Sequence, residues 1–563
     1  MRTHSLLLFS SILLFSCRSS SVMTSKNSAK SPSSMVVCSH PAAAKVGIDI
    51  LRRGGNAFDA AIATQFALAV VYPRAGNLGG GGLMVFRDQF SNTGALDFRE
   101  KAPLNASTDM FLDNRGKVIN NMSLVGVYSA GVPGTVDGMY QMHRSKGSLS
   151  WFQLIQPAVD LAENGVLLTV NEANHLNQYS SIIDSVSKIK TAFSAKTWTA
   201  GDLFIQKDLA KTLKSIRDHG RDGFYKGSVA TSIKASMITH YGLISQNDLD
   251  EYHAVWRQPI STSYKGYQLT MMPPPSSGGI MIAQMLKGVE MLQLTKYPLN
   301  SIQYIHGLTE LQRRAYADRA IYYGDPDYVD NQQELLLSDE YVKDKFGNID
   351  MEKASKSETT VSGNFTKKES FETTHFSVVD QWNNAVAITT TLNDNYGSKL
   401  VVSGAGFLLN NEMDDFSSKP GAPNMFGMVG GDANKIMPGK RMLSSMTPTI
   451  LSRDGKLFAV IGTPGGSTII TVNLQTILDI TDYNYSMQDA VTAPKMHSQW
   501  FPDVIYLEKG KFAPEVVAGL EKMGHQISEI NALGKLDCIK VLPDGRLEGG
   551  TDKSKGDGTI ESF

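Results

Sequence analysis

A short threonine-rich hairpin constrains the fold of this chain more than any other stretch. Residues 373–380 and 384–393 are both rich in β-branched side chains, which favour strands, and the polar residues between them are typical of a turn. If the turn centres on Trp382, antiparallel pairing places Thr391 opposite Thr373. The pattern therefore predicts two neighbouring hydroxyls at one end of a hairpin.

A threonine at the start of a strand, with a second hydroxyl beside it, suits an N-terminal nucleophile. In that chemistry the chain is cut just before the threonine, and the freed α-amine activates the threonine's own side chain. An ordinary threonine-rich strand is the simpler interpretation of these residues alone, since short motifs often match by chance. We expect His375 to be a packed polar side chain and not part of a Ser/His relay, because the chain has no G-x-S-x-G elbow.

The composition limits the function classes that fit. Acidic and basic residues nearly cancel over 563 residues and leave a formal charge of −1, which argues against a dominant nucleic-acid or membrane-surface role. The three cysteines, Cys17, Cys38 and Cys538, provide no disulfide framework and no C-x-x-C metal site. The histidines show no H-E-x-x-H pairing, so neither a catalytic metal nor a cofactor is expected.

The N-terminus has the pattern of an export signal. A basic start precedes the apolar run 6–15, which is too short to span a bilayer. Residues 14–17 resemble a bacterial lipoprotein processing site that would place a lipid on Cys17, although a phenylalanine is unusual there. The alternative is cleavage nearby and release of a soluble protein. In both cases we expect residues 1–17 to be a signal, 18–35 a serine-rich tether, and the mature protein to be periplasmic or at the cell surface.

Apolar patterns predict several helices, and a strand before Arg99, ahead of the hairpin. Helices are expected over residues 40–53, 57–71, 151–164, 209–217, 280–292 and 301–322. The stretch 57–71 is apolar nearly all round, so this helix should be buried, with Asn56 as its cap. Residues 95–98 predict a strand that delivers Arg99 at its end.

Three stretches without helical periodicity are informative. The glycine run 76–82 is followed by a strand and by no Gly-Lys-Ser/Thr, which argues against a nucleotide site and favours tight turns beside an active site. Residues 350–372 are polar and charged, the composition of a flexible tether where a cut chain end must swing away. Residues 419–440 are too long and polar for a tight connection, which suggests a functional loop.

Six motifs together resemble the γ-glutamyltranspeptidase family, and the resemblance runs from about residue 36 to the end. They are Asp97-Phe98-Arg99-Glu100-Lys101-Ala102-Pro103, Pro274-Pro275-Ser276-Ser277-Gly278-Gly279, Thr373-Thr374-His375, Asn410-Asn411-Glu412-Met413-Asp414-Asp415-Phe416, Leu443-Ser444-Ser445-Met446 and Gly462-Thr463-Pro464-Gly465-Gly466-Ser467. Their shared order argues against coincidence and favours the nucleophile over the ordinary strand.

The resemblance implies an α/β fold, the four-layer αββα sandwich of N-terminal nucleophile hydrolases, formed by both segments of a self-cleaved precursor. The cut falls between Glu372 and Thr373, giving a large subunit, 36–372, and a catalytic small subunit, 373–563, held together noncovalently. The implied activity is γ-glutamyl transfer and glutathione hydrolysis without a cofactor. The implied partners are glutathione and related γ-glutamyl amides, amino acid or dipeptide acceptors, and the other subunit; nucleic acid is not expected, and a membrane only through an N-terminal lipid.

The resemblance also implies roles for individual residues. The group at the reacting bond is the nucleophile Thr373, its orienting neighbour Thr391, and the oxyanion donors Gly465 and Gly466. The group that holds the substrate's α-carboxylate is Arg99, Ser444 and Ser445. The group that holds its α-ammonium is Asn393, Glu412 and Asp415. Phe426 is assigned to the position of the lid's aromatic residue, which in the family is often tyrosine.

Three departures from the family pattern leave subunit association and the choice of acceptor open. Thr468 follows Gly-Gly-Ser where arginine is usual, Met442 follows Arg441 where proline is common, and Lys553 follows Asp552 in place of the proline of Asp-Pro-Arg. Two alternatives remain for the function. One is a related acylase of the cephalosporin or poly-γ-glutamate type, and the other is an inactive exported binding protein on the same fold.

Overall fold

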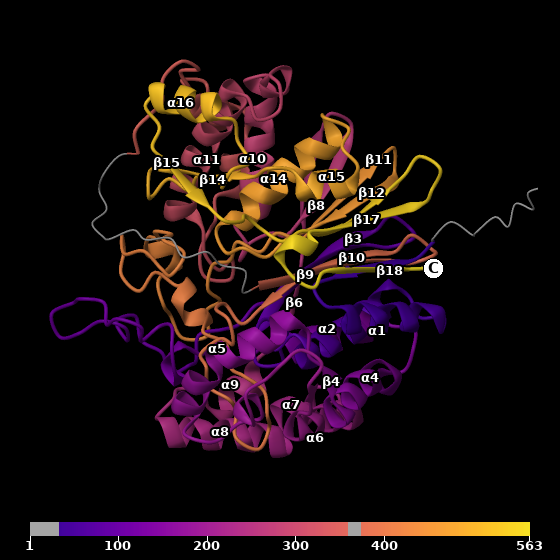
Figure 1. Cartoon of the computed structure of the whole chain (residues 1–563). Helices are drawn as coiled ribbons and strands as arrows, with labels where there is room; N and C mark the ends of the chain where they lie inside the picture. The colour runs from indigo at the N-terminus through magenta and orange to yellow at the C-terminus, as the bar shows by residue number, and fades with distance from the viewer. Residues whose placement is uncertain (1–32, 358–372) are drawn as a thin grey trace, which may run out of the picture. The chain divides into compact units, whose positions relative to one another are not determined.

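Two stacked antiparallel sheets form the centre of the computed structural model, which describes residues 33–357 and 373–563 (Figure 1). The first sheet has seven strands in the order β18-β1-β9-β10-β2-β3-β6. Its strands are β1 (Met35–Cys38), β2 (Gly81–Arg87), β3 (Thr93–Phe98), β6 (Val255–Arg257), β9 (Thr373–Val379), β10 (Ala385–Thr391) and β18 (Thr559–Ser562). The predicted hairpin therefore lies in the middle of this sheet.

The second sheet has six strands in the order β17-β16-β12-β11-β8-β7. They are β7 (Ile260–Tyr264), β8 (Tyr267–Met271), β11 (Thr449–Arg453), β12 (Lys456–Ile461), β16 (Asp537–Val541) and β17 (Leu547–Thr551). Both sheets contain strands from before and from after residue 372. A cut at that position would leave two segments that share both sheets.

The sheets bury apolar side chains on both faces, as a four-layer sandwich requires. Along β2, Leu83 and Val85 join the apolar layer between the two sheets, while Met84 and Phe86 pack against helices on the other side. This period of two, with apolar residues on both faces, follows from the pleat of a strand covered on both sides. The predicted αββα class is confirmed.

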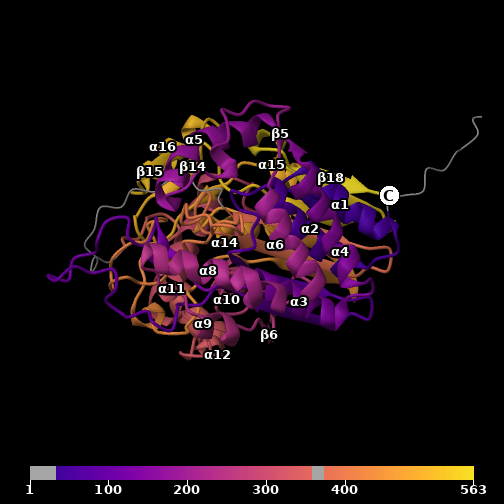
Figure 2. The ribbon, with the colours of Figure 1, turned by 90° about the horizontal axis from the view of Figure 1, so that it is seen from below.

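Helices on the outer face of the first sheet form one helical layer, below the sheets in Figure 1 and in front in Figure 2. Helix α2 is buried along its whole length and is capped by Asn56, which exchanges hydrogen bonds with Asp59, as predicted. The layer comprises α1 (Pro41–Arg52), α2 (Ala57–Val71), α3 (Thr135–Lys146), α4 (Trp151–Asn164), α6 (Lys207–His219), α7 (Asp222–Tyr225), α8 (Gly227–His240) and α9 (Gln246–Glu251). Helix α5 (Val170–Ser187) and the strand pair β4 (Val166–Leu167) and β5 (Leu203–Phe204) lie beside it.

The second helical layer covers the outer face of the second sheet, above it in Figure 1. It comprises α10 (Gly278–Met291), α11 (Ile302–Tyr322), α12 (Gln333–Leu337), α13 (Asp339–Phe346), α14 (Thr468–Thr481), α15 (Met487–Thr492) and α16 (Pro514–Lys522). A small sheet of β13 (Met496–His497), β14 (Ile505–Glu508) and β15 (Ile527–Ile530) joins this layer. Of the described helices, none has the length and apolar content needed to cross a membrane.

The hairpin register agrees with the prediction, because Thr373 pairs with Thr391. Strand β10 ends at Thr391, however, two residues before the predicted end, since the backbone of Asn393 has a φ of 77°. Residues 419–440 form no strand and contain one short 3₁₀ turn, Asp432–Asn434. The predicted signal with Cys17 and most of the polar tether with Glu372 lie outside the described residues.

Candidate active site

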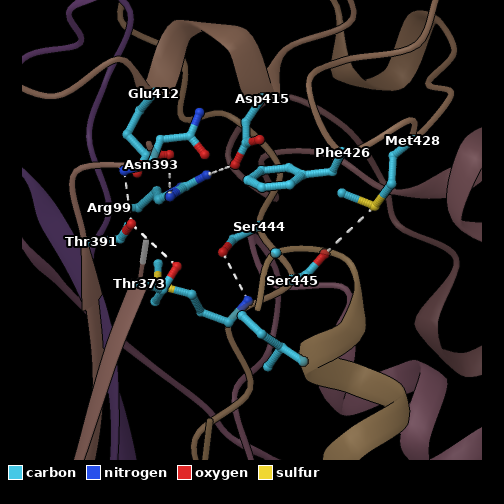
Figure 3. A pocket seen from close by; sticks show the side chains of 13 residues that line it. Arg99, Thr373, Thr391, Asn393, Glu412, Asp415, Phe426, Met428, Ser444 and Ser445 are labelled. Carbon is cyan, nitrogen blue, oxygen red and sulfur yellow. Dashed lines mark hydrogen bonds and ion pairs between the residues drawn. The ribbon is translucent and has the colours of Figure 1, made fainter. Parts of the chain in front are cut away.

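Thr373 begins β9, and its hydroxyl points at that of Thr391 at the end of the neighbouring strand (Figure 3). The Thr373 hydroxyl donates to Thr391 Oγ1 at 3.3 Å, and Thr391 Oγ1 also accepts a hydrogen bond from the backbone N–H of Asn393 at 2.8 Å. Both threonine side chains are almost fully buried. The hairpin therefore brings together the hydroxyl pair expected from the sequence, in an orientation set by the backbone of Asn393.

The glycine run before β2 packs against the end of β10. The side-chain amide of Asn77 donates to the carbonyl of Thr391 at 2.9 Å. A Cβ on Gly80 would lie 2.1 Å from that same carbonyl oxygen, and Gly81 pairs with Thr391 across the sheet. Neither Gly80 nor Gly81 has a positive φ. The prediction that these glycines lie beside the site is confirmed, but they permit a close approach and not a sharp turn.

Arg99 follows β3 directly and projects between two carboxylates from the 3₁₀ turn Glu412–Asp415. Its Nη1 lies 2.7 Å from Glu412 Oε2 and its Nη2 lies 2.5 Å from Asp415 Oδ2. The guanidinium also donates to the carbonyls of Met442 and Leu443, at 3.3 Å each. The residues expected to hold opposite ends of a substrate are therefore neighbours that pair with each other in this structure.

The charges around Arg99 do not balance. Glu100, which is fully buried, is 3.8 Å from the same guanidinium, so three carboxyl groups face one arginine. Burial raises the pKa of Glu412, as does repulsion from Glu100 and Asp415; burial also raises the pKa of Glu100, to about 8. A second cation would relieve this repulsion, so the Glu412 end of the cavity suits a ligand ammonium.

The serine pair lies at the other end of the cavity, on a loop held by the Pro274–Gly279 turn. The Ser444 N–H donates to the carbonyl of Pro275 at 2.7 Å, and the carbonyl of Ser444 accepts from the Ser277 N–H at 2.9 Å. The hydroxyl of Ser444 accepts from the N–H of Met446 at 3.1 Å. Backbone bonds thus hold the serine loop in place and leave both hydroxyls at the cavity.

Gly465 and Gly466 lie just before α14, with φ angles of 137° and 55° that favour glycine. Gly466 lines the cavity, whereas Gly465 is next to it and is not among the lining residues. The Thr468 hydroxyl donates to the carbonyl of Gly465 at 2.8 Å, which fixes the turn from the position where the family usually has arginine. Phe426 of the 419–440 loop covers Gly466 and lines the cavity, as the lid assignment predicts.

We expect Gly466→Ala to weaken lid closure. A Cβ at this position would lie 2.5 Å from Phe426 Cδ1, so the ring must move. Overpacking by one methyl costs about 1 kcal/mol or more, and we expect the KM for substrate to rise about fivefold. Steady-state kinetics checks this, with Gly466→Ala/Phe426→Ala as the control. The double variant keeps the backbone strain of alanine at a φ of 55° but not the clash, so Gly466→Ala should raise the KM less in the Phe426→Ala background than in the wild type. An equal rise in both backgrounds would mean that the clash with the ring is not the cause.

One cavity collects almost the whole predicted site. The predicted residues that line it are Arg99, Thr373, Thr391, Asn393, Glu412, Asp415, Phe426, Ser444, Ser445 and Gly466. Met428, Met446 and Ile469 also line it and were not predicted, since isolated apolar residues carry no sequence signal for a site. Glu100, which lies 3.8 Å from the Arg99 guanidinium, was also missed; it could have been found as the carboxylate that follows Arg99 in the chain.

His375 lies away from the cavity, packed in the first sheet. Its ring nitrogens are 2.9 Å from Thr389 Oγ1 and 3.1 Å from Ser377 Oγ. Burial lowers the pKa of His375 to about 3, so the ring is neutral over the pH range in which enzymes work. This agrees with the expected packed polar side chain.

Among the described residues, one group has the spacing of metal ligands: His306, Glu310 and His525, with ligand atoms within 4.8 Å of one another. Glu310 is already paired with Arg313 and Arg314, and His306 Nδ1 is 2.7 Å from His525 Nε2. Two guanidinium groups beside the only carboxylate of the group oppose binding of a cation. The arrangement is a buried polar network of the second helical layer.

The αββα sandwich, with a threonine at the start of a central strand, defines the class of N-terminal nucleophile hydrolases. The chain belongs to the γ-glutamyltranspeptidase family, whose model (Gamma-glutamyltranspeptidase) matches residues 43–562. It is 44% identical over 521 residues to a glutathione hydrolase proenzyme of Escherichia coli (strain K12), covering 92% of this chain and 90% of the relative. It is 33% identical over 534 residues to the acylase ACY 1 proenzyme of Pseudomonas sp. (strain SE83), covering 93% and 92%.

Solved structures agree with the fold. The cephalosporin acylase from Bacillus halodurans superposes with a TM-score of 0.82 at 24% identity, covering 98% of this chain and 99% of that chain, and so supports the fold alone. The Helicobacter pylori gamma-glutamyltranspeptidase superposes with a TM-score of 0.54 at 43% identity, covering 56% of this chain and 91% of that chain.

Proposed function

We propose that this chain is a precursor that cuts itself before Thr373 and then acts as a γ-glutamyltransferase and glutathione hydrolase. The observation that carries the proposal is the cavity at the start of β9, where a hydroxyl pair faces a buried guanidinium and an excess of carboxylates. Such a cavity suits a small zwitterion attached to a scissile amide. Membership of the γ-glutamyltranspeptidase family supports the same reaction.

In maturation, the Thr373 hydroxyl oxygen attacks the carbonyl carbon of Glu372. The peptide nitrogen of Thr373 leaves as its α-amine, and Glu372 is held as an ester on the threonine oxygen. Water hydrolyses the ester, which frees the carboxylate of Glu372 and returns the hydroxyl. The products are segments 36–372 and 373–563, which stay together because strands of both fill both sheets.

In turnover, the α-amine of Thr373 accepts the proton of its own hydroxyl as the oxygen attacks the γ-carbonyl of the substrate. The amide bond breaks, the leaving amine takes the proton, and the γ-glutamyl group remains on Thr373 as an ester. Water or an acceptor amine then attacks the ester and releases glutamate or a new γ-glutamyl amide. We assign Thr391 to orient Thr373, and the N–H groups of Gly465 and Gly466 to stabilise the oxyanion.

The α-ammonium and the α-carboxylate of the substrate's glutamyl group bind to different residues of the cavity. We assign the α-ammonium to Glu412, Asp415 and the side-chain carbonyl of Asn393, because three carboxyl groups face one guanidinium at that end. We assign the α-carboxylate to Ser444, Ser445 and Arg99, which offer hydroxyl and guanidinium donors. Phe426 closes the cavity over the bound group.

Release of cysteinylglycine from glutathione by purified protein, with and without a dipeptide acceptor, tests the proposal. We expect release without the acceptor, and a γ-glutamyl dipeptide as a second product with it. A protein that ignores glutathione but hydrolyses a glutaryl amide, which lacks the ammonium, would be an acylase. A processed protein that acts on neither would be a binding protein.

The rate should rise with pH. The α-amine of a chain terminus titrates near pH ~8, and only its neutral form accepts a proton. We therefore expect kcat/KM for glutathione to increase from about pH 6 to about pH 9 and then level off. His375 cannot produce this rise, because its pKa of about 3 keeps it neutral throughout. A kcat/KM that fell steadily over this range, with circular dichroism unchanged, would contradict the amine as base.

We also propose that the protein works outside the cytoplasm, on the basis of the signal-like residues 1–17. Fractionation of expressing cells tests the location, and mass spectrometry of the mature N-terminus shows whether Cys17 carries a lipid. A full-length chain in the cytoplasm would contradict export.

A further inference from the structure

Arg319, on the inner side of α11, is a buried cation with no counter-ion. Its side chain is 5% exposed, and its Nε donates to Ser277 Oγ at 3.0 Å. Its Nη2 points at Ser445 Oγ, 3.5 Å away. No carboxylate of residues 33–357 or 373–563 lies within 4.0 Å of its nitrogens. Arg99, by contrast, has two carboxylates at hydrogen-bonding distance.

The two serines that touch Arg319 lead to the Ser444–Ser445 loop. Ser277 uses its hydroxyl proton to donate to the carbonyl of Ser444 at 3.0 Å, so it can only accept from Arg319. The hydroxyl proton of Ser445 has the thioether sulfur of Met428 at 3.9 Å as its acceptor, which is a weak one. A guanidinium can only donate, so it leaves the Ser445 proton free to turn toward a stronger acceptor in the cavity.

From this arrangement we infer that Arg319 is a positioning residue for the substrate's α-carboxylate, acting through Ser445. The inference rests on the proposed function and adds a determinant of substrate choice. The guanidinium of Arg99 already shares its charge with Glu412 and Asp415, so the substrate's α-carboxylate gains less from Arg99 than it would from an unpaired cation. Arg319 has no carboxylate partner among the described residues, and its Nη2 lies 3.5 Å from Ser445 Oγ. Figure 3 shows Ser444 and Ser445 at the opposite end of the cavity from Glu412. Arg319 therefore favours the γ-glutamyl group in the orientation that puts its carboxylate on the serines.

The thermal stability of an Arg319 variant shows whether Arg319 serves substrate binding or the stability of the fold. A buried cation without a counter-ion destabilises a fold, so its removal should not lower the Tm. Arg319→Gln can keep a donor near the position of Nε, facing Ser277, and loses both the charge and the Nη2 group that faces Ser445. We expect it to be cleaved normally, with a Tm equal to or above that of the wild type.

The test compares two chromogenic substrates: the 4-nitroanilide of the glutamate γ-carboxyl group, and the 4-nitroanilide of 4-aminobutyrate, which lacks the α-carboxylate. For Arg319→Gln we expect kcat/KM to fall about tenfold for the first, mainly through KM, and to change little for the second. Arg319→Lys keeps the charge and should recover part of the loss. In a Ser445→Ala background, Arg319→Gln should have a much smaller effect, because the serine that transmits it is gone.

Tyr316, one turn earlier on α11, provides the matched control. Its hydroxyl donates to the carbonyl of Ser467 at 2.5 Å, so Tyr316→Phe loosens the neighbouring loop without changing charge. Tyr316→Phe should lower kcat/KM for both substrates by the same factor. Equal losses for both substrates in Arg319→Gln, a lower Tm, or failure of the Arg319 variants to fold would each overturn the inference. A wild-type protein that releases no nitroaniline from the glutamate substrate and no cysteinylglycine from glutathione would instead overturn the proposed function.

Discussion

Replacing Thr373 by alanine should leave the exported chain in one piece and without γ-glutamyl transfer. The same hydroxyl is proposed to attack Glu372 in maturation and the substrate in turnover, so one atom is lost from both reactions. Loss of a catalytic nucleophile typically costs about 10⁴- to 10⁶-fold in rate. The fold should survive, because within the described residues the Thr373 side chain bonds Thr391 alone, and the backbone pairing of β9 remains.

Denaturing gel electrophoresis and glutathione hydrolysis measure the two effects on one sample. Thr373→Ser is the control, since it keeps a hydroxyl at the same place and should still be cut, more slowly. Thr374→Ala is a second control, because the neighbouring Thr374 hydroxyl bonds Ser39 and is not part of the cavity. If Thr373→Ala is still cut into two chains, Thr373 is not the nucleophile. The same follows if Thr374→Ala stays in one piece while Thr373→Ala is cut.

Much of the fold could be predicted because local patterns and tertiary packing agree. The hairpin register followed from the position of its turn, and the observed pairing of Thr373 with Thr391 obeys the same symmetry. Helix α2 could be recognised as buried because it has no polar face. The stacking of two sheets could not be derived in this way. Strands apolar on both faces fit several architectures, and only the family resemblance selected the sandwich.

The site residues could be named from motifs, but their mutual pairing could not. Sequence order gives no sign that Arg99 lies between Glu412 and Asp415, since the contact joins segments more than 300 residues apart and depends on how β3 meets the 412–415 turn. Arg319 was missed for a related reason. Helix α11 is buried on most sides, so its polar residues show no periodicity that would mark an inward-facing charge.

Arg99→Lys should separate maturation from substrate binding. The substrate's α-carboxylate is absent when Thr373 attacks Glu372, so cutting into two chains should continue. Lysine keeps the charge but loses the planar fork, with which Arg99 can bond the substrate's α-carboxylate as well as its neighbours Glu412 and Asp415. The loss of one charge-assisted hydrogen bond is worth about 1.5–3 kcal/mol, so kcat/KM for glutathione should fall roughly 10- to 150-fold. If Arg99 holds ground state and transition state equally, the loss appears as a higher KM.

Arg257→Lys is the matched control, because Arg257 also bridges two carboxylates, those of Asp97 and Asp327, and is not part of the cavity. It should cost some stability and leave the KM for glutathione unchanged. If the Arg99→Lys chain stays uncut, Arg99 is needed for folding or maturation and its role is not confined to substrate binding. A fully cut Arg99→Lys enzyme with unchanged kcat/KM would mean that the carboxylate is held by the Ser444–Ser445 loop alone. In that case Arg319, which pairs with no carboxylate of the described residues, would be the cation left to attract it.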